Sequence, residues 1–246
     1  MATRIRRRMG VHERREQLIA VALEQFSLRS PEEVSVDDIA AAAGISRPLV
    51  YHYFPGKHGL YEAAVGRAAE DLADRLVEPA EGPLGSRLLR VMNRYFDFVD
   101  DHGPGFAALL RGGSAVGSER TTAMIDGVRQ RAYEQLLRHL EISEPGPRVS
   151  LLVRSWIGLA ETAALTWLEG SGIPREELEL RLCYDFLALA AVSAALDPEA
   201  GSVVRRILAE EPPDGPSQAL LSQLARVGRE SLPGPASGSR PRAARA

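Results

Sequence analysis

Residues 35–54 have the sequence SVDDIAAAAGISRPLVYHYF, which predicts two short helices joined by a tight turn. Ser35 and Asp38 have the spacing of a capping box, which starts a helix over 36–43. Gly44 ends this helix, because glycine readily adopts the left-handed conformation that closes a helix. Two short helices separated by a glycine turn are the pattern of a helix-turn-helix.

The second helix, predicted over 47–54, has one apolar face and one polar face. Ser46 is its N-cap, and Pro48 lies in the first turn, where a missing N–H costs little. The residues expected to face inward share helical spacing and are Val50, Tyr53 and Phe54. The outward face carries Arg, Tyr and His side chains, as a recognition helix would. Generic helix pairs of this kind also occur in all-α proteins that bind no DNA.

The charge balance differs between the two ends of the chain. The whole sequence of 246 residues has a formal charge of −3, which taken alone argues against nucleic acid. Residues 1–57, however, hold nine Lys or Arg against seven Asp or Glu, while the remainder holds 21 against 26. The asymmetry predicts a basic N-terminal part and an acidic remainder with separate functions.

Composition excludes several other classes of protein. The chain has one cysteine, Cys183, so we expect no internal disulfide and no zinc site built from several cysteines. The apolar run Phe186–Leu196 is shorter than the roughly 20 residues that a membrane span needs. No apolar segment of a secretory signal follows the basic N-terminus. We therefore expect a cytoplasmic protein without membrane contact, metal or cofactor.

Helical periodicity continues through the rest of the chain, and no segment alternates as a β-strand would. Pro and Gly residues divide the pattern into further predicted helices at 11–29, 57–78, 84–102, 104–111, 119–141, 147–169 and 174–196, with weaker ones at 200–210 and 217–229. The expected fold class is all-α. The expected organisation is a basic arm (1–10), a three-helix DNA-binding head (11–57), a larger helical domain (58–230) and a disordered tail (231–246).

Residues 12–65 resemble the N-terminal domain of the TetR family of transcriptional regulators. The positions that match the family pattern are Phe26, Ser35, Ile39, Ala40, Ala43, Gly44, Ile45, Ser46, Tyr51, Phe54, Lys57 and Leu60. The match covers about fifty residues without a gap. The resemblance implies DNA binding by the head and a C-terminal domain that binds a ligand and dimerises.

The candidate DNA contacts lie on the arm, the helix-turn-helix and the start of the next helix. They are Arg6, Arg7, Arg8, Ser35, Ser46, Arg47, Pro48, Leu49, Tyr51, His52 and Lys57. Arg47 has the donors to contact guanine or a phosphate. Lys57, the only lysine, would add its charge to a helix N-terminus that already favours phosphate. Leu49 departs from the small hydroxylated residue of many family members, so contacts there would be apolar.

A ligand pocket is expected among the large apolar side chains of the second domain. The candidate lining residues are Met92, Phe96, Phe106, Leu110, Met124, Trp156 and Glu161. For each apolar residue, ordinary core packing is the competing interpretation. Glu161 lies in an apolar stretch, and a buried carboxylate needs a partner. It would either orient a polar group of the ligand or pair with an arginine such as Arg154 or Arg94.

The helix at 174–196 is apolar on most sides and rich in small residues, so it predicts close packing. By the resemblance, the last two large helices pair with those of a second copy. The candidate interface residues are Trp167, Phe186, Leu187, Ala190, Ala191 and Ala194. A symmetric homodimer would place two recognition helices about 34–36 Å apart on a palindromic double-stranded operator.

Motifs typical of enzymes are missing from the sequence, namely HExxH, GxSxG, a P-loop and CxxC. The sequence is therefore interpreted as a ligand-responsive, homodimeric transcriptional regulator, most simply a repressor that a small apolar or amphipathic molecule releases from DNA. One alternative is an activator or a ligand-independent regulator. A second alternative is an all-α binding module or enzyme without DNA binding.

Overall fold

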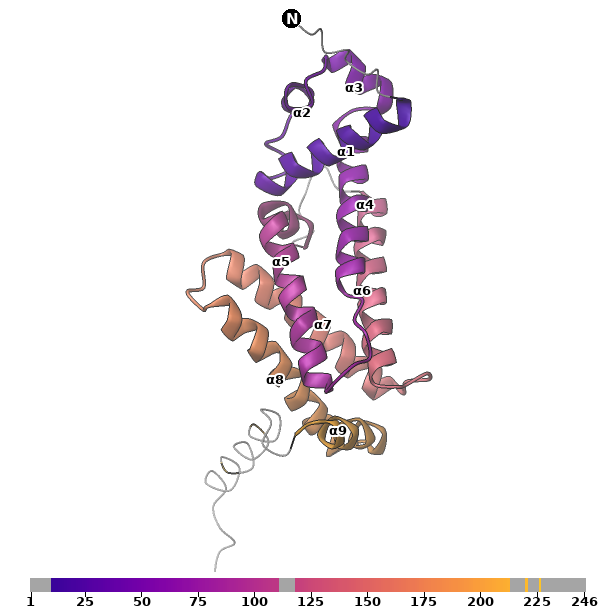
Figure 1. The fold of residues 1–246 in the computed structure, drawn as a ribbon, viewed down its shortest axis with the longest axis vertical. Coiled ribbons are helices and arrows are strands. Elements are labelled where there is room, and N and C mark those ends of the chain that lie inside the picture. The colour runs from indigo at the N-terminus through magenta and orange to yellow at the C-terminus, as the bar shows by residue number, and fades with distance from the viewer. Residues whose placement is uncertain (1–9, 111–117, 213–219, 221–225, 227–246) are drawn as a thin grey trace, which may run out of the picture.

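The structure is a computed structural model that describes residues 10–110, 118–212, 220 and 226. Within these residues the chain forms nine α-helices and no β-strand, which confirms the all-α fold class. The molecule is elongated, with the first three helices at one end (Figure 1). The predicted arm and tail, and most of the predicted helix 217–229, lie outside the described residues.

The head is built from α1 (Val11–Leu28), α2 (Val36–Ala42), α3 (Arg47–Tyr53) and the first half of α4 (Lys57–Arg75). Its core is one cluster of buried apolar side chains, among them Leu18, Phe26, Ile39, Val50, Phe54 and Leu60. Each such side chain contributes about 1.5–3 kcal/mol on full burial. Burial of both Val50 and Phe54 fixes which face of α3 turns outward.

The local signals around the turn act as the sequence predicts. The Ser35 hydroxyl accepts from the Asp38 amide at 3.1 Å, and the Ser35 amide donates to the Asp38 carboxylate at 2.8 Å. Gly44 has φ of 66°, the left-handed conformation that ends α2. Ser46 occupies the N-cap of α3, but its side chain makes no capping hydrogen bond.

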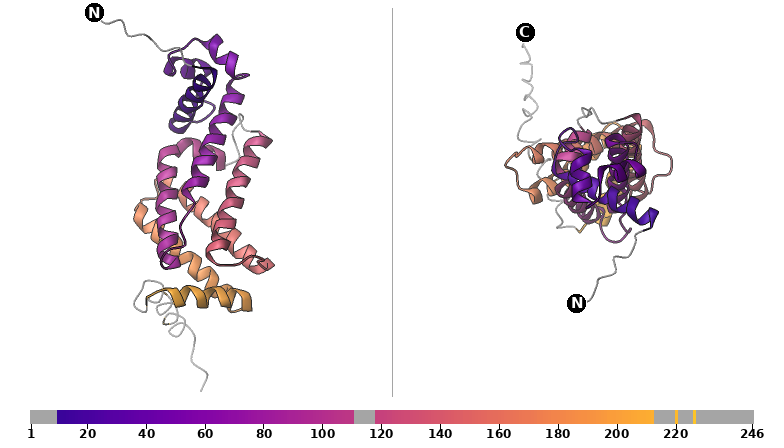
Figure 2. Two further views of the ribbon diagram at one scale, coloured as in Figure 1. Left: turned by 45° about the vertical axis from the view of Figure 1, so that its right-hand side comes forward. Right: turned by 90° about the horizontal axis from the view of Figure 1, so that it is seen from above.

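The larger part contains α5 (Leu84–Leu110), α6 (Glu119–His139), α7 (Pro147–Leu168), α8 (Arg175–Ala194) and α9 (Pro198–Glu210). Helices α4, α5 and α6 run along the length of the molecule, and α9 lies across the end far from the head (Figures 1 and 2). A second buried apolar cluster joins these helices. Helix α4 supplies residues to both clusters, because Val65 belongs to the head core and Leu72 to the second core.

Helix α5 corrects one expectation, because it continues through Gly103 and Pro104, where the sequence predicts a break. Pro104 removes one backbone donor, but it lies on the exposed side of the helix, where water reaches the freed carbonyl group. Gly103 and Gly105 are buried on the other side. A Cβ at Gly105 would run into the carbonyl oxygen of Phe26 in α1. Tertiary packing therefore outweighs the local signal to stop.

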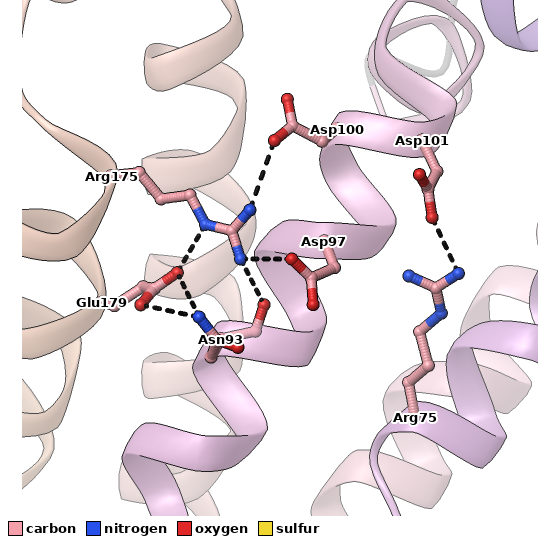
Figure 3. A network of polar contacts seen from close by, with 7 residues as sticks. All are labelled: Arg75, Asn93, Asp97, Asp100, Asp101, Arg175 and Glu179. Atoms are coloured by element: carbon pink, nitrogen blue, oxygen red, sulfur yellow. Dashed lines mark hydrogen bonds and ion pairs between the residues drawn. The ribbon is translucent and has the colours of Figure 1, made fainter.

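An arginine at the start of α8 fastens this helix to α5 (Figure 3). Arg175 donates to Asp97 at 2.6 Å, to Asp100 at 3.3 Å and to the carbonyl oxygen of Asn93 at 2.7 Å. It also donates to Glu179 on its own helix at 2.6 Å. Burial lowers the pKa of Arg175, but the hydrogen bonds to these carboxylates raise the pKa above its usual value.

Candidate functional site

The outer face of α3 presents the side chains that the sequence assigns to DNA contact. Ser46, Arg47, Pro48, Leu49, Tyr51 and His52 are all exposed. Leu49 and Tyr51 expose 37% and 46% of their surface, although both have large apolar side chains. No apolar core requires these residues, so this face is available for a partner. Ser35 is also exposed, at the N-cap of α2.

Arg47 is held in place by two neighbouring side chains of the head. It donates to the Asp37 carboxylate of α2 at 2.9 Å and to the Tyr51 hydroxyl at 3.3 Å. The hydrogen bond with Tyr51 and the charge of Asp37 raise the pKa of Arg47. The guanidinium therefore keeps its charge, and any phosphate or base that contacts it would have to displace Asp37.

Lys57 is the first residue of α4, at the position that the sequence predicts. Its Nζ donates to the carbonyl oxygen of Glu32 at 3.1 Å. The contact uses one of three ammonium donors, so two donors stay available. Arg6, Arg7 and Arg8 lie outside the described residues.

The second candidate site is a cavity of about 130 Å³ between α4, α5, α6 and α7. For comparison, an engineered apolar cavity of about 150 Å³ in another protein binds one benzene molecule. Most of the wall is apolar, with Ala68 and Leu72 from α4, Leu88 and Met92 from α5, Val128 from α6 and Trp156 from α7. Trp156 is fixed by a hydrogen bond of 2.8 Å from its indole N–H to the carbonyl oxygen of Leu182.

Five of the seven residues expected in the pocket lie on this wall, and they are Met92, Phe106, Leu110, Trp156 and Glu161. Phe96 lies elsewhere, fully buried with its ring edge against Trp167 at a centroid distance of 5.6 Å. Met124 also lies elsewhere, because its side chain packs on Gly66 and the head core. Their helical positions alone do not separate the cavity wall from the neighbouring core.

Glu161 pairs with an arginine other than the two expected from the sequence. Arg129 of α6 donates to both carboxylate oxygens of Glu161, at 2.8 and 3.0 Å. The arginines expected as partners lie elsewhere, since Arg94 bonds to Glu78 and Arg154 to Gln130. Both members of the pair line the cavity. Glu161 therefore forms a salt bridge with an arginine, as one of the two interpretations expects, and it also lies on the cavity wall; its role in orienting a ligand stays a prediction.

Tyr95 of α5 also lines the cavity. Burial, and then the charge of Glu161, raise the pKa of Tyr95, so its hydroxyl keeps its proton. The oxygen is buried and has no hydrogen-bond partner among the described residues.

A polar cluster at the far end of the cavity is not predicted by the sequence. Arg87 of α5 donates to Nδ1 of His139 at 3.1 Å and to Glu210 of α9 at 2.7 Å. Burial, and then the charge of Arg87, lower the pKa of His139, so its ring is neutral near pH 7. Burial raises the pKa of Glu78, but hydrogen bonds from Arg94 and Arg90 outweigh burial and hold it below its usual value.

The residues expected at a dimer interface divide into two groups. Phe186, Leu187 and Ala190 are buried inside the chain's own core. Trp167, Ala191 and Ala194 are half-buried. The exposed side of α8 instead carries Val192, and α7 exposes Leu151, each with 67% of its surface accessible. The sequence correctly indicates an apolar helix, but its composition does not show which side the core already covers.

Other kinds of site find no support in the described part of the chain. No group of three or more His, Cys, Asp or Glu residues there is placed to hold a metal ion. None of the described helices is long and apolar enough to cross a membrane. Burial raises the pKa of Cys183 to about 12, so this thiol is not a reactive thiolate.

Two family models match the chain, one for each part. "Bacterial regulatory proteins, tetR family" matches residues 18–64, and "Tetracyclin repressor-like, C-terminal domain" matches residues 84–189. A solved tetR-family transcriptional regulator from Streptomyces coelicolor is 66% identical, with a TM-score of 0.86. The alignment covers 90% of this chain and 100% of that protein.

More distant relatives are also regulators. The HTH-type transcriptional regulator BetI of Stenotrophomonas maltophilia is 27% identical over 191 residues, covering 74% of this chain and 95% of BetI. The HTH-type transcriptional activator FasR of Mycolicibacterium smegmatis is 31% identical over 105 residues, covering 42% of this chain and 48% of FasR. The protein is a DNA-binding regulator rather than an enzyme, and it belongs to the TetR family of transcriptional regulators.

Proposed function

We propose that the chain is a homodimeric repressor that leaves a palindromic operator when a small apolar or amphipathic molecule fills the cavity. The observation that supports this proposal most is the course of α4. Val65 of α4 belongs to the head core and also lines the cavity, and Leu72 and Leu76 line the cavity further along. A molecule that pushes on α4 therefore displaces the helix that carries Lys57.

The ligand shifts the equilibrium only if it binds the state with displaced heads more tightly than the operator-bound state. Repression needs only occupancy of the operator, whereas activation needs a further contact with the transcription machinery. The head and the cavity account for occupancy and release. One relative is named as an activator, so the experiment has to measure whether this protein represses or activates transcription.

Binding of the purified protein to its own upstream DNA across a salt series tests the DNA-binding step. Replacing Lys57 with Ala should weaken binding to all DNA sequences about equally. It should also lower the slope of log affinity against log salt concentration by about 1. Replacing Arg47 with Ala should weaken the operator about tenfold and random DNA less, if Arg47 contacts a base. Equal losses on both DNAs would assign Arg47 to phosphate, and no binding at any salt would refute the proposal.

Transcription from the upstream promoter then tests the direction of regulation. Added protein should lower transcript yield, and an increase would favour the activator.

We place the dimer face on the exposed sides of α7 and α8. On α7 this side carries a stripe of small residues at helical spacing, which are Ser155, Gly158, Thr162 and Thr166. Small side chains let two helices approach closely. Val192 of α8 adds an exposed apolar side chain. The half-buried Trp167, Ala191 and Ala194 border these helices and would contribute at the edge.

Replacing Gly158 with Gln tests this placement. A Cβ at Gly158 meets no atom within 4 Å, so one chain accommodates the longer side chain and gains about 0.5–1 kcal/mol of helix propensity. The same side chain would separate the two copies. Sedimentation should show monomers, and circular dichroism an intact helical fold. Gly127, which also has open space around it on α6, gives the matched control, and a dimer that survives only in the Gly127 variant supports the placement.

A further inference from the structure

The charged side chains on the cavity wall are a feature that the proposed function leaves unexplained. Among the described residues they are Glu78, Arg87, Arg129 and Glu161, on a wall that is otherwise almost wholly apolar. Burial lowers the pKa of the His139 ring, which also lies on the wall, so this ring is neutral near pH 7. A charge among apolar side chains is stable only beside a partner of opposite sign. The partners of the four charged groups therefore determine which ligand charge the wall tolerates.

Glu78 and Arg87 each have a partner of opposite charge that lies outside the wall. Nε of Arg90 and Nη2 of Arg94 donate to the two carboxylate oxygens of Glu78, at 2.7 and 2.6 Å. Arg87 donates to Glu210 of α9 at 2.7 Å. The side chains of Glu78 and Arg87 are only 2% and 7% exposed, so water does not replace these partners. Both wall charges are therefore neutralised within the protein.

Arg129 of α6 and Glu161 of α7 are partners of each other on the wall. Nε and Nη2 of Arg129 donate to the two oxygens of Glu161, at 2.8 and 3.0 Å, in the bidentate geometry that makes arginine–carboxylate pairs strong. Nη1 of Arg129 donates to Asp126 at 2.9 Å. Both oxygens of Glu161 and all three nitrogens of Arg129 are thus engaged by protein groups. Neither charge is left for a charged group of a ligand.

The balance of charge holds for the wall residues and their partners together. Four arginines pair with four carboxylates, and these are Arg87, Arg90, Arg94, Arg129, Glu78, Asp126, Glu161 and Glu210. A ligand carboxylate would have to displace one of the protein's carboxylates from its arginine, and a ligand cation would have to displace an arginine. The displaced group would lose its partner in largely apolar surroundings, which is strongly unfavourable. An uncharged ligand displaces no partner.

We propose that the cavity selects uncharged, mainly apolar ligands, and that the Arg129–Glu161 pair sets this selectivity. The side chains of Arg129 and Glu161 are 38% and 22% exposed. Loss of one member therefore leaves the other partly hydrated, so that the wall gains a net charge while the fold is kept. This ligand class rests on the proposed function of the cavity as the regulatory site, and it narrows the small apolar or amphipathic molecule to an uncharged one. Its binding is measurable without DNA.

Three probes that share one phenyl ring but differ in charge test the selectivity in calorimetric titrations of the full-length protein. Benzyl alcohol is neutral, benzoate is anionic and benzylammonium is cationic. One benzene ring suits a cavity of about 130 Å³. We expect benzyl alcohol to bind at least about tenfold more tightly than either ion. A smaller advantage over either ion, or no binding of benzyl alcohol, would overturn the proposal.

Replacing one member of the pair should shift the selectivity, in a direction that depends on the member removed. E161Q leaves Arg129 without its bidentate carboxylate, so benzoate should gain about tenfold in affinity relative to benzyl alcohol. R129M leaves Glu161 without a cation, so benzylammonium should gain instead. The double variant R129M/E161Q carries neither charge and should keep the wild-type ranking of the three probes. The opposite directions exclude a general loosening of the wall, because loosening would not favour one ion over the other.

The Arg181–Asp185 pair of α8 gives the matched controls, because it joins the same kinds of group at 3.0 Å and lies outside the cavity wall. D185N and R181M change the net charge of the protein as E161Q and R129M do, and they should leave the ranking of the probes unchanged. Circular dichroism should show the same helical content in all variants. A shift in D185N as large as that in E161Q, or an unchanged ranking in folded E161Q and R129M, would overturn the proposal.

Operator binding is measured separately by fluorescence anisotropy, with and without benzyl alcohol. Operator binding by a protein that does not discriminate between the three probes refutes this ligand class alone. Selective binding of benzyl alcohol without a change in operator affinity refutes the ligand response alone, and the charge selectivity of the cavity then stands.

Discussion

Ser27 at the end of α1 and His102 of α5 are joined by a hydrogen bond of 2.8 Å between Oγ and Nδ1. The opposite ring nitrogen, Nε2, lies 3.8 Å from the Asp71 carboxylate of α4. One imidazole therefore connects the helix at the base of the head with two helices of the larger part. Any displacement of the head relative to α5 has to change this contact.

The His102 contact predicts how stability depends on pH. Burial lowers the pKa of His102 more than Asp71 and Asp101 raise it, so the folded protein binds this proton less tightly than the unfolded chain. The contribution of neutral His102 to the free energy of unfolding is fully present above about pH 6.5. This contribution is lost as the pH falls through the lower pKa of His102 in the folded protein. Replacing His102 with Gln should reduce the fall in the urea midpoint between about pH 7.5 and about pH 5.5.

His139 provides the control for this window, because the pKa of its buried ring is lowered as well. A variant that lacks only His102 should keep the part of the fall in the urea midpoint that is due to His139. A variant that lacks both histidines should lose most of the pH dependence of the urea midpoint. Carboxylates with lowered pKa, such as Asp197, affect stability only at more acidic pH. An unchanged fall in the His102 variant would contradict the assignment.

Two neighbouring glycines of α5 should respond in opposite directions to alanine. A Cβ at Gly105 runs into the Phe26 carbonyl, so G105A should push α1 away and cost about 1–3 kcal/mol of unfolding free energy. A Cβ at Gly103 meets only Leu168, at an ordinary distance of 3.8 Å. G103A should therefore gain about 0.5–1 kcal/mol from helix propensity. Denaturant unfolding measures both, and a destabilised G103A would show that α5 does not run unbroken through Pro104.

The Arg175 network should be worth far more than a surface ion pair. Glu179 is buried, with 5% of its surface exposed, and Arg175 is its closest cation. Replacing Arg175 with Met should cost about 3 kcal/mol of unfolding free energy, because a charge is left buried without its partner. Arg181 pairs with Asp185 on the same helix and is 70% exposed, so replacing Arg181 with Met should cost only about 0.3–0.5 kcal/mol. Similar losses in both variants would contradict this ranking.

Short-range signals account for what could be predicted from the sequence. The Ser35–Asp38 box and Gly44 act within a few residues of the chain, and the structure has both as expected. Pro104 is the exception. The helix continues through Pro104 because Gly105 packs against Phe26 of α1, which lies 79 positions away in sequence. Local patterns predict a helix end only when no distant contact outweighs them.

The cavity shows the same division. Met92 and Trp156 are recognisable as large apolar residues, but the wall formed by α4 is assigned only once that helix is placed beside α5 and α6. The apolar spacing Val65, Ala68, Leu72 and Leu76 was the available signal. The Arg87–His139 and Arg129–Glu161 pairs join residues 52 and 32 positions apart. No spacing rule connects such pairs, because their meeting depends on how the helices cross.

The last prediction concerns the competition between Asp37 and DNA for Arg47. The 2.9 Å hydrogen bond between Arg47 and Asp37 has to break before Arg47 reaches a phosphate or a base. The Asp37 carboxylate also repels nearby phosphates. Replacing Asp37 with Asn should strengthen DNA binding about threefold at low salt, with a smaller gain at high salt, because screening weakens charge effects. The neighbouring Asp38 caps α2, so D38N should lower the stability of the head without the same gain in affinity. Fluorescence anisotropy and thermal unfolding measure the two effects, and an unchanged or weaker affinity of D37N would show that Asp37 positions Arg47 for DNA instead of competing with it.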